Sequence, residues 1–195
     1  ASCNSFHLIW LFVTCLHYHV HVIIAKLKPH LGTSKLSLLD VGCGDLQWMS
    51  KFLLSRSDIQ YTCVEIIEDI VKHHKQVFAK LPSAKFVHFD IVDIPFNHSY
   101  DLVLCRDIFQ TMPHGEALQA LQHISASKSK FMLATIFPDT TENPEVVSSK
   151  KPTQWYPYNL EIPPFSLEPP ICTSYDWNLE HLALWPLPLK QKYEF

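Results

Sequence analysis

Short apolar runs alternate along the chain with stretches whose apolar residues recur every three to four positions. Residues 37–42 (SLLDVG) form the first run, which closes on a glycine, and apolar side chains then recur at helical spacing from Leu46 to Leu53. This succession predicts a strand, a tight turn and a helix. The pattern repeats, so strands are expected over 37–42, 60–66, 85–91, 101–105 and 130–137, and helices over 67–81 and 115–126.

The predicted strands are apolar at successive positions instead of at every second one. Strands of this kind are typical of a parallel sheet that is covered on both faces, with right-handed crossovers. The expected fold is therefore α/β, a doubly wound and mostly parallel sheet with helices on both faces. Near the C-terminus, residues 171–175 and 181–185 predict a closing antiparallel pair.

The segment from 138 to 170 interrupts this pattern because it contains eight prolines. Proline excludes a long helix or a central strand, so a long loop is expected there. Loops of such length inside a compact domain are usually functional or disordered. We expect residues 1–36 to form an N-terminal apolar, histidine-rich segment with a lead-in helix, and 37–195 to form one domain with the 138–170 loop over its site.

Composition and charge support a folded domain and argue against a nucleic-acid partner. The chain is 47% hydrophobic and 18% charged, far from the composition of disordered proteins. Its formal net charge is -3 and its lysines are scattered, so no basic surface that would follow a phosphate backbone is expected. A small molecule is the expected partner.

The cysteines and the N-terminus bear on the compartment. Six cysteines occur without a CxxC pair, which favours reduced thiols and a cytoplasmic location. The apolar run at residues 8–16 is too short to span a bilayer and lacks a positively charged start, so a buried or interfacial segment is expected. A secreted or membrane-associated protein is the alternative, which the Asn97-His98-Ser99 glycosylation triplet would fit.

Candidate chemistry gathers where the predicted strands end. Ligands of an open parallel sheet bind beyond the carboxyl ends of its strands, and two of the four glycines, Gly42 and Gly44, lie in the first such turn. Acidic residues lie at the ends of the first three strands, at Asp40, Glu65 and Asp90. Each also has a simpler structural explanation, since Glu65, for example, would suit the start of the next helix. Their joint position at one sheet edge favours a ligand site.

The turn Asp40-Val41-Gly42-Cys43-Gly44 resembles that of class I S-adenosylmethionine-dependent methyltransferases, in which an acidic residue ends the first strand and x-G-x-G follows. The resemblance covers residues 37–137 well and the remainder loosely. It implies a Rossmann-like fold, transferase activity and S-adenosyl-L-methionine as cofactor. The runs DVGCGD, LCRDIFQ and NLEIPPF look like those of a group of small, poorly characterised members.

The resemblance also implies roles for individual residues. Glu65 matches the acid that accepts both ribose hydroxyls, and Asp90 matches the contact to the adenine amino group, with Ile91 beside the ring. The segment Cys105-Arg106-Asp107 matches the lining of the methyl-donor and acceptor sites. The expected cofactor-binding residues are Asp40, Gly42, Cys43, Gly44, Asp45, Trp48, Glu65, Ile66, Asp90, Ile91 and Cys105.

Catalytic candidates follow from the reaction. Because an acceptor that carries a proton needs a base, Asp107, His114 and Glu161 are candidates, the first two just past the fourth strand and the third in the proline-rich loop. Arg106 is the candidate to hold an acidic substrate or an internal carboxylate. The methyl acceptor itself is not identified by the sequence.

One position departs from the family pattern. Members commonly carry a third small residue where this chain has Leu46, whose side chain would either crowd the methionine moiety or begin the helix. The alternative to an active enzyme is therefore a catalytically inactive protein of methyltransferase fold that serves in binding or interaction.

Other cofactors and substrates fit less well. A dinucleotide fingerprint needs a third glycine where Gln47 stands, and a DNA adenine methyltransferase would carry a different motif directly after the fourth strand. The alternating His17, His19 and His21 would share one face of a strand, but no complete set of zinc ligands accompanies them, so no metal is expected.

Overall fold

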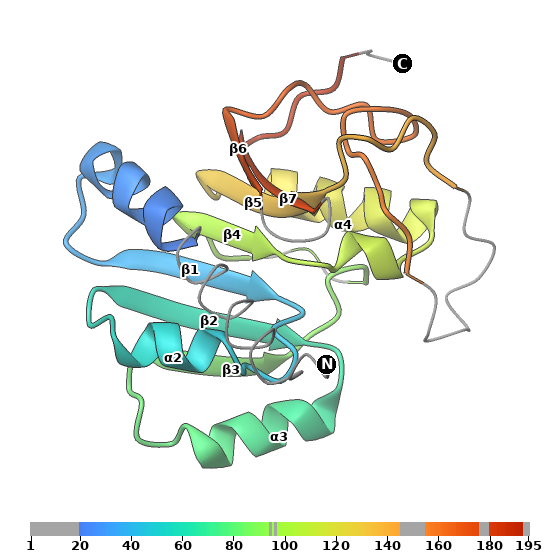
Figure 1. Cartoon of the computed structure of the whole chain (residues 1–195). Coiled ribbons are helices and arrows are strands. Elements are labelled where there is room, and N and C mark those ends of the chain that lie inside the picture. The colour runs from blue at the N-terminus through green and yellow to red at the C-terminus, as the bar shows by residue number, and fades with distance from the viewer. Residues whose placement is uncertain (1–19, 94, 96, 145–154, 176–179, 193–195) are drawn as a thin grey trace, which may run out of the picture.

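Seven strands form one sheet in the order β3-β2-β1-β4-β5-β7-β6 (Figure 1). The computed structural model describes residues 20–93, 95, 97–144, 155–175 and 180–192. The strands confirm the predicted succession to within a few residues at each end. They are β1 (Leu36–Val41), β2 (Ile59–Glu65), β3 (Ala84–His88), β4 (Leu102–Cys105), β5 (Phe131–Ile136), β6 (Cys172–Tyr175) and β7 (His181–Pro186).

The sheet is parallel from β3 through β5 and antiparallel at its other edge. The neighbours from β3 to β5 all pair parallel, β7 pairs antiparallel to β5, and β6 pairs antiparallel to β7. The predicted closing pair therefore forms, with Cys172 opposite Leu184. Because the pair extends the main sheet through β7, its apolar residues complete the core instead of standing alone.

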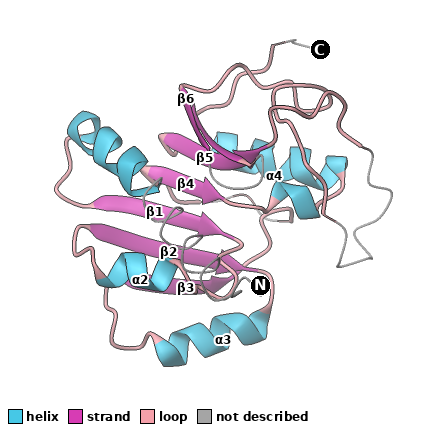
Figure 2. Cartoon of the chain, viewed as in Figure 1, coloured by secondary structure: helices cyan, strands magenta, loops and turns pink. Residues whose placement is uncertain are grey.

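Helices cover both faces of this sheet, as the apolar strands predict (Figure 2). The side chains of Leu36 and Leu38 lie in one apolar core, and those of Leu39 and Val41 lie in the other. The first core contains the helix at residues 20–31 with α2 (Met49–Leu54) and α3 (Glu68–Val77), and the second contains α4 (His114–Ala126). Alternate side chains of one strand point to opposite faces, which explains why β1 carries leucine and valine side chains on both of its faces.

The described parts of the proline-rich segment, 138–144 and 155–170, contain no helix and no named strand. They are nevertheless well packed, because Tyr158, Leu160 and Phe165 are fully buried in the core that contains α4. The loop predicted here is thus an ordered covering of that face over its described residues.

The structure describes only part of the N-terminal segment for which predictions were made. The apolar run at 8–16, His17 and His19 lie outside the described residues, whereas His21 lies in the helix at 20–31 with its Nδ1 3.0 Å from a guanidinium nitrogen of Arg56. Among the described residues, no helix is long and apolar enough to cross a membrane. The same residues contain no group of three side chains suited to hold a metal ion.

Candidate functional site

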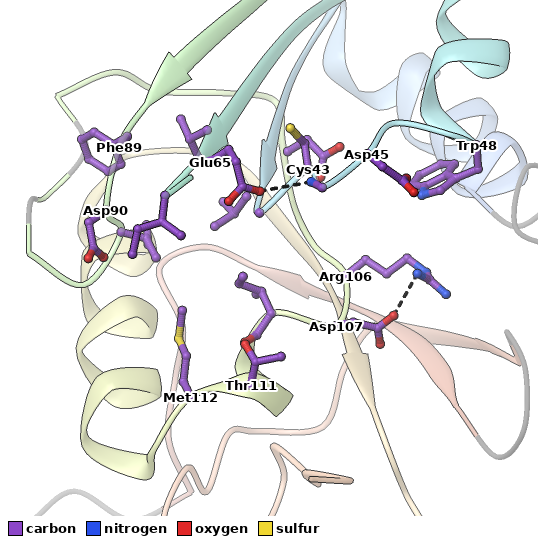
Figure 3. Close-up of a pocket in the computed structure, with 18 of the residues that line it drawn as sticks. Cys43, Asp45, Trp48, Glu65, Phe89, Asp90, Arg106, Asp107, Thr111 and Met112 are labelled. Carbon is purple, nitrogen blue, oxygen red and sulfur yellow. Dashed lines mark hydrogen bonds and ion pairs between the residues drawn. The ribbon is translucent and has the colours of Figure 1, made fainter. Parts of the chain in front are cut away.

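A cavity of about 640 Å³ opens where β1, β2, β3 and β4 end (Figure 3). Its volume is in the range of ordinary small-molecule sites. Glu65 and Asp90 lie on one side, and Arg106 and Asp107 lie on another. The wall consists of Asp40, Val41, Gly42, Cys43, Gly44, Asp45, Gln47, Trp48, Val64, Glu65, Ile66, Phe89, Asp90, Ile91, Arg106, Asp107, Ile108, Thr111 and Met112.

The turn after β1 needs both of its glycines. Gly42 has φ +68° and Gly44 has φ +56°, in the left-handed region that disfavours side chains. A Cβ atom at Gly42 would also lie 2.4 Å from the Cδ1 atom of Ile108, which is itself part of the wall. Glycine at this position therefore keeps the backbone and the Ile108 side chain in the places that shape the cavity.

Glu65 connects the ends of β1 and β2. Its Oε2 accepts a hydrogen bond from the Gly44 amide at 3.2 Å, and its Oε1 accepts one from the Ile67 amide at 3.1 Å. The residue is only 6% exposed. Glu65 thus has both predicted roles: it binds a backbone amide at the start of the following helix, and it lies on the cavity wall.

Asp40 is a buried acid whose environment favours the neutral form. Its Oδ2 accepts a hydrogen bond from the Tyr61 hydroxyl at 2.7 Å. Burial raises the pKa of Asp40 from 3.8 to about 7, against the opposing effects of that hydrogen bond and of Arg106. Asp40 therefore titrates near neutral pH at the edge of the cavity.

The high pKa of Asp40 predicts a dependence of stability on pH. Between about pH 4 and 7, folded Asp40 holds a proton that the unfolded chain has lost, so its contribution to the free energy of unfolding falls as the pH rises. In the wild type this decrease in the free energy of unfolding is on the order of 2–4 kcal/mol across the window, and replacing Asp40 with Asn should abolish it. Urea denaturation at pH 4.5 and 7 measures it. The exposed acid Asp45, replaced with Asn, is the control that should keep the wild-type difference; equal differences in all three proteins would contradict the prediction.

Leu46 points away from the cavity. It has φ +58°, is 2% exposed and packs in the core that contains α2, while its neighbours Gln47 and Trp48 line the wall. The left-handed backbone at this position directs the side chain inward. Neither expectation for Leu46 describes it fully: the residue is not part of the cavity wall, and α2 begins three residues later, at Met49.

Arg106 is engaged by carboxylates of the chain itself. One guanidinium nitrogen lies 2.8 Å from Oδ2 of Asp107, and another lies 3.7 Å from Oε2 of Glu180, which precedes β7. Asp107 has φ +56°, and its amide donates to the Thr135 hydroxyl at 3.0 Å. Arg106 was predicted to hold either an acidic substrate or an internal carboxylate, and the structure shows two internal carboxylates.

Most of the remaining predicted residues also lie on the wall. Asp90 accepts a hydrogen bond from the Val92 amide at 2.8 Å, and Asp45 accepts one from the Gln47 amide at 3.1 Å. These bonds fix the two local turns and hold the acids beside the cavity. Asp45, Trp48, Ile66, Asp90 and Ile91 all belong to the wall.

Three predicted residues lie elsewhere. Cys105 is fully buried in the core, and burial raises the pKa of its thiol well above the usual value. His114 lies at the start of α4 against the rings of Tyr158 and Phe165, and Glu161 lies 4.0 Å from the Lys192 ammonium. None of the three is part of the cavity wall that the structure describes.

The expectation of reduced cysteines is wrong for one pair. Cys43, in the glycine turn, forms a disulfide with Cys63 in β2, and their Cα atoms are 5.7 Å apart. Parallel pairing places Cys63 opposite Asp40, and the turn then brings Cys43 back over β2. A CxxC spacing does not predict this pair, because the pairing of strands in the sheet, and not the local sequence, brings the two residues together. Of the other described cysteines, Cys105 and Cys172 are free.

Several contributors to the site were not foreseen. Tyr61 bonds to Asp40, Glu180 pairs with Arg106, and Thr135 supports Asp107. Alternation along β2 signals that Tyr61 and Cys63 share a face, and this could have suggested the contact with Asp40 in the neighbouring strand. The Glu180 contact had no comparable signal. Val41, Gln47, Val64, Phe89, Ile108, Thr111 and Met112 complete the wall.

Comparisons with known proteins agree with this geometry. Residues 38–127 match the sequence model of a methyltransferase domain. Malonyl-[acyl-carrier protein] O-methyltransferase of Acetivibrio thermocellus is 33% identical over 78 residues, which are 40% of this chain and 27% of that enzyme. The matched sequence is thus a small part of that relative.

Two solved structures share the fold. CurJ carbon methyltransferase superposes with a TM-score of 0.63 at 13% identity, over 88% of this chain and 54% of that one. Magnesium protoporphyrin IX methyltransferase of Synechocystis PCC 6803, solved with bound SAH, gives 0.51 at 18% identity over 72% and 64%. The chain therefore spans less than two thirds of either protein. Residues 38–127 thus match a methyltransferase domain in sequence, and the chain shares its fold with solved methyltransferases.

Proposed function

We propose that the chain binds S-adenosyl-L-methionine in this cavity and transfers its methyl group to a small molecule. The observation that carries the proposal is the shared wall. The glycine turn, Glu65, Asp90 and the Arg106–Asp107 pair come from four strand ends and surround one space. Ligands of this class of sheet bind at that edge.

The chain's groups fit the proposed cofactor. Glu65 presents a carboxylate for the two ribose hydroxyls, Ile66 and Ile91 present apolar surface for the adenine, and the glycine turn lets the methionine part approach the backbone. Besides Asp40, whose burial favours the neutral form, the described wall carries four carboxylates, and its one cationic side chain, Arg106, is already paired with Asp107. A wall of this charge suits a ligand that contains a sulfonium and an ammonium group.

In the proposed reaction the protein acts mainly by positioning. The cofactor supplies an activated methyl group, and an in-line displacement depends on holding the acceptor in the correct direction. We assign the proton of the acceptor to Asp107, because this residue lies on the wall with its side chain 28% exposed and its Oδ1 without a hydrogen-bond partner among the described residues, whereas His114 is not part of the described wall. Arg106 holds Oδ2 of that carboxylate and thereby fixes the direction of the whole carboxyl group.

Binding and transfer are tested separately. Isothermal titration of the whole chain with S-adenosylhomocysteine should give saturable binding, and a wild-type protein that does not bind would overturn the cofactor assignment. Labelled cofactor is then incubated with fractionated metabolites. Asp107→Asn should bind the ligand within a few-fold of the wild-type affinity and lose at least about 100-fold in transfer, the lower end of the range for a lost base. Transfer at the wild-type rate would overturn the role of Asp107.

The inactive-protein alternative loses one of its two motivating observations. It rested on a bulky Leu46 beside the methionine moiety and on the unusual N-terminus. The Leu46 side chain is buried in the core instead, and residues 1–19 lie outside the described part of the chain, so one of the two motivations remains untested. Binding of S-adenosylhomocysteine without transfer into any metabolite or protein fraction would favour that alternative again.

We further propose that residues 37–195 act as one domain whose 138–170 loop borders the acceptor side of the cavity. The Tyr156 amide donates to the Gln110 carbonyl at 2.9 Å, and the Tyr158 hydroxyl donates to the carbonyl of Met112, a wall residue, at 3.1 Å. Slower hydrogen exchange of residues 155–170 on ligand addition would support this, and unchanged exchange would count against it.

We also propose a cytoplasmic location. The Cys43–Cys63 disulfide argues against this location. Disulfides persist mainly in oxidising compartments. Thiol alkylation of protein taken rapidly from cells decides the question, because a cytoplasmic protein should show both cysteines as thiols after denaturation. Protection of both would favour the secreted alternative.

A further inference from the structure

His74 is a buried polar side chain behind the glycine turn. It lies in α3, is 2% exposed, and its ring centroid is 5.9 Å from that of Phe78 and 5.5 Å from that of Phe86. An apolar residue would suit these neighbours better than an imidazole, because an imidazole that leaves water loses its hydrogen bonds. Packing alone therefore does not account for histidine at this position.

The hydrogen bond that His74 makes accounts for it. Its Nε2 lies 2.7 Å from the carbonyl oxygen of Gly44. Since a carbonyl only accepts, Nε2 must carry the hydrogen and donate it. Nδ1 is buried without a hydrogen-bond partner among the described residues. The bond to Gly44 is thus the one polar contact of the ring in the part of the chain that the structure describes.

The peptide groups of Gly44 are held from two directions. Its amide donates to Glu65 at 3.2 Å, as the dashed line in Figure 3 marks, and its carbonyl accepts from His74. Gly44 has φ +56° and no side chain to restrict it, so these bonds limit its conformations in addition to the disulfide that ties the adjacent Cys43 to β2. α3 and the end of β2 together set the direction of the backbone that borders the cavity.

We infer that His74 is a positioning residue, which holds the glycine turn in the conformation that receives the cofactor. The inference rests on the proposed function, because it concerns the affinity of the same cavity. A turn that is already ordered loses less conformational freedom on binding, and the affinity rises accordingly. Loss of one such hydrogen bond should weaken binding about 3- to 10-fold.

The experiment compares replacements that differ in the reach of a donor. His74→Gln keeps an amide nitrogen at about the distance of Nε2, His74→Asn carries its amide too close to the helix to reach Gly44, and His74→Leu has no donor. His73→Leu is the matched control, since His73 is the exposed neighbour in α3. For each whole chain we would measure the affinity for S-adenosylhomocysteine and, without ligand, the hydrogen exchange of residues 42–48.

We expect the variants to differ according to whether their side chain can still donate a hydrogen bond to the Gly44 carbonyl. His74→Gln should stay within about twofold of wild type in affinity, whereas His74→Asn and His74→Leu should bind 3- to 10-fold more weakly and exchange faster at residues 42–48. The control should change neither measurement. Should the Leu variant not fold, the comparison of Gln with Asn gives the same answer.

Two outcomes would overturn the inference. Exchange at residues 42–48 that is unchanged in the Asn and Leu variants would show that His74 does not hold the turn. Equal losses in the Gln, Asn and Leu variants would assign the effect to ring packing instead of the hydrogen bond. A wild-type chain that binds no S-adenosylhomocysteine would instead refute the proposed function, and the exchange measurement would still report on the turn.

Discussion

Replacing Glu65 with Gln should weaken the binding of S-adenosylhomocysteine by about 30- to 100-fold, the largest effect on affinity that we expect. A carboxylate accepts hydrogen bonds from the ribose hydroxyls and from the backbone, and charged hydrogen bonds contribute about 1.5–3 kcal/mol each. In the variant, one carboxylate oxygen becomes an amide group that donates, so it faces either the Gly44 amide or the Ile67 amide unfavourably. Isothermal titration measures the affinity.

Glu68→Gln is the control for this prediction. Glu68 is the first residue of α3, three positions along the chain, and its side chain is 59% exposed and paired with Lys72. It should bind as the wild type does. Circular dichroism should show that both variants are folded at the temperature of the titration. A Glu65→Gln variant that is folded and binds within threefold of wild type would contradict the role that the resemblance implies.

Replacing Leu46 with Ala should lower the free energy of unfolding by about 2–5 kcal/mol, the largest effect on stability that we expect. The side chain is 2% exposed and fills space between Met49, Phe52 and the neighbouring strands, so its removal leaves a cavity in the core. The affinity for S-adenosylhomocysteine should change by less than threefold, because Leu46 is not part of the wall. Urea denaturation and titration measure the two quantities.

Gln47→Ala separates the two faces of this turn. Gln47 is exposed and lines the cavity, so its replacement should change the free energy of unfolding by no more than about 0.5 kcal/mol. A Leu46→Ala variant with wild-type stability and tighter binding would reverse our conclusion. It would mean that the Leu46 side chain crowds the ligand, as the departure from the family pattern suggests.

The sequence alone determined the architecture and the position of the site. Periodicity distinguishes strands from helices because it depends only on which side chains of a segment must be buried together. Apolar strands that alternate with helices leave few arrangements besides a parallel sheet, and such a sheet collects the ends of its strands at one edge. For this reason the positions of Asp40, Glu65 and Asp90 along the chain are enough to assign all three to one cavity.

Only the tertiary structure decided which way individual side chains point and which distant residues meet. A left-handed backbone turns Leu46 into the core, the pairing of β1 with β2 joins Cys43 to Cys63, and Glu180 reaches Arg106 from the far end of the chain. His74 meets Gly44 because α3 packs behind the turn. These contacts depend on backbone torsion and on the register of packed elements, and neither is encoded in the local pattern of apolar and polar residues.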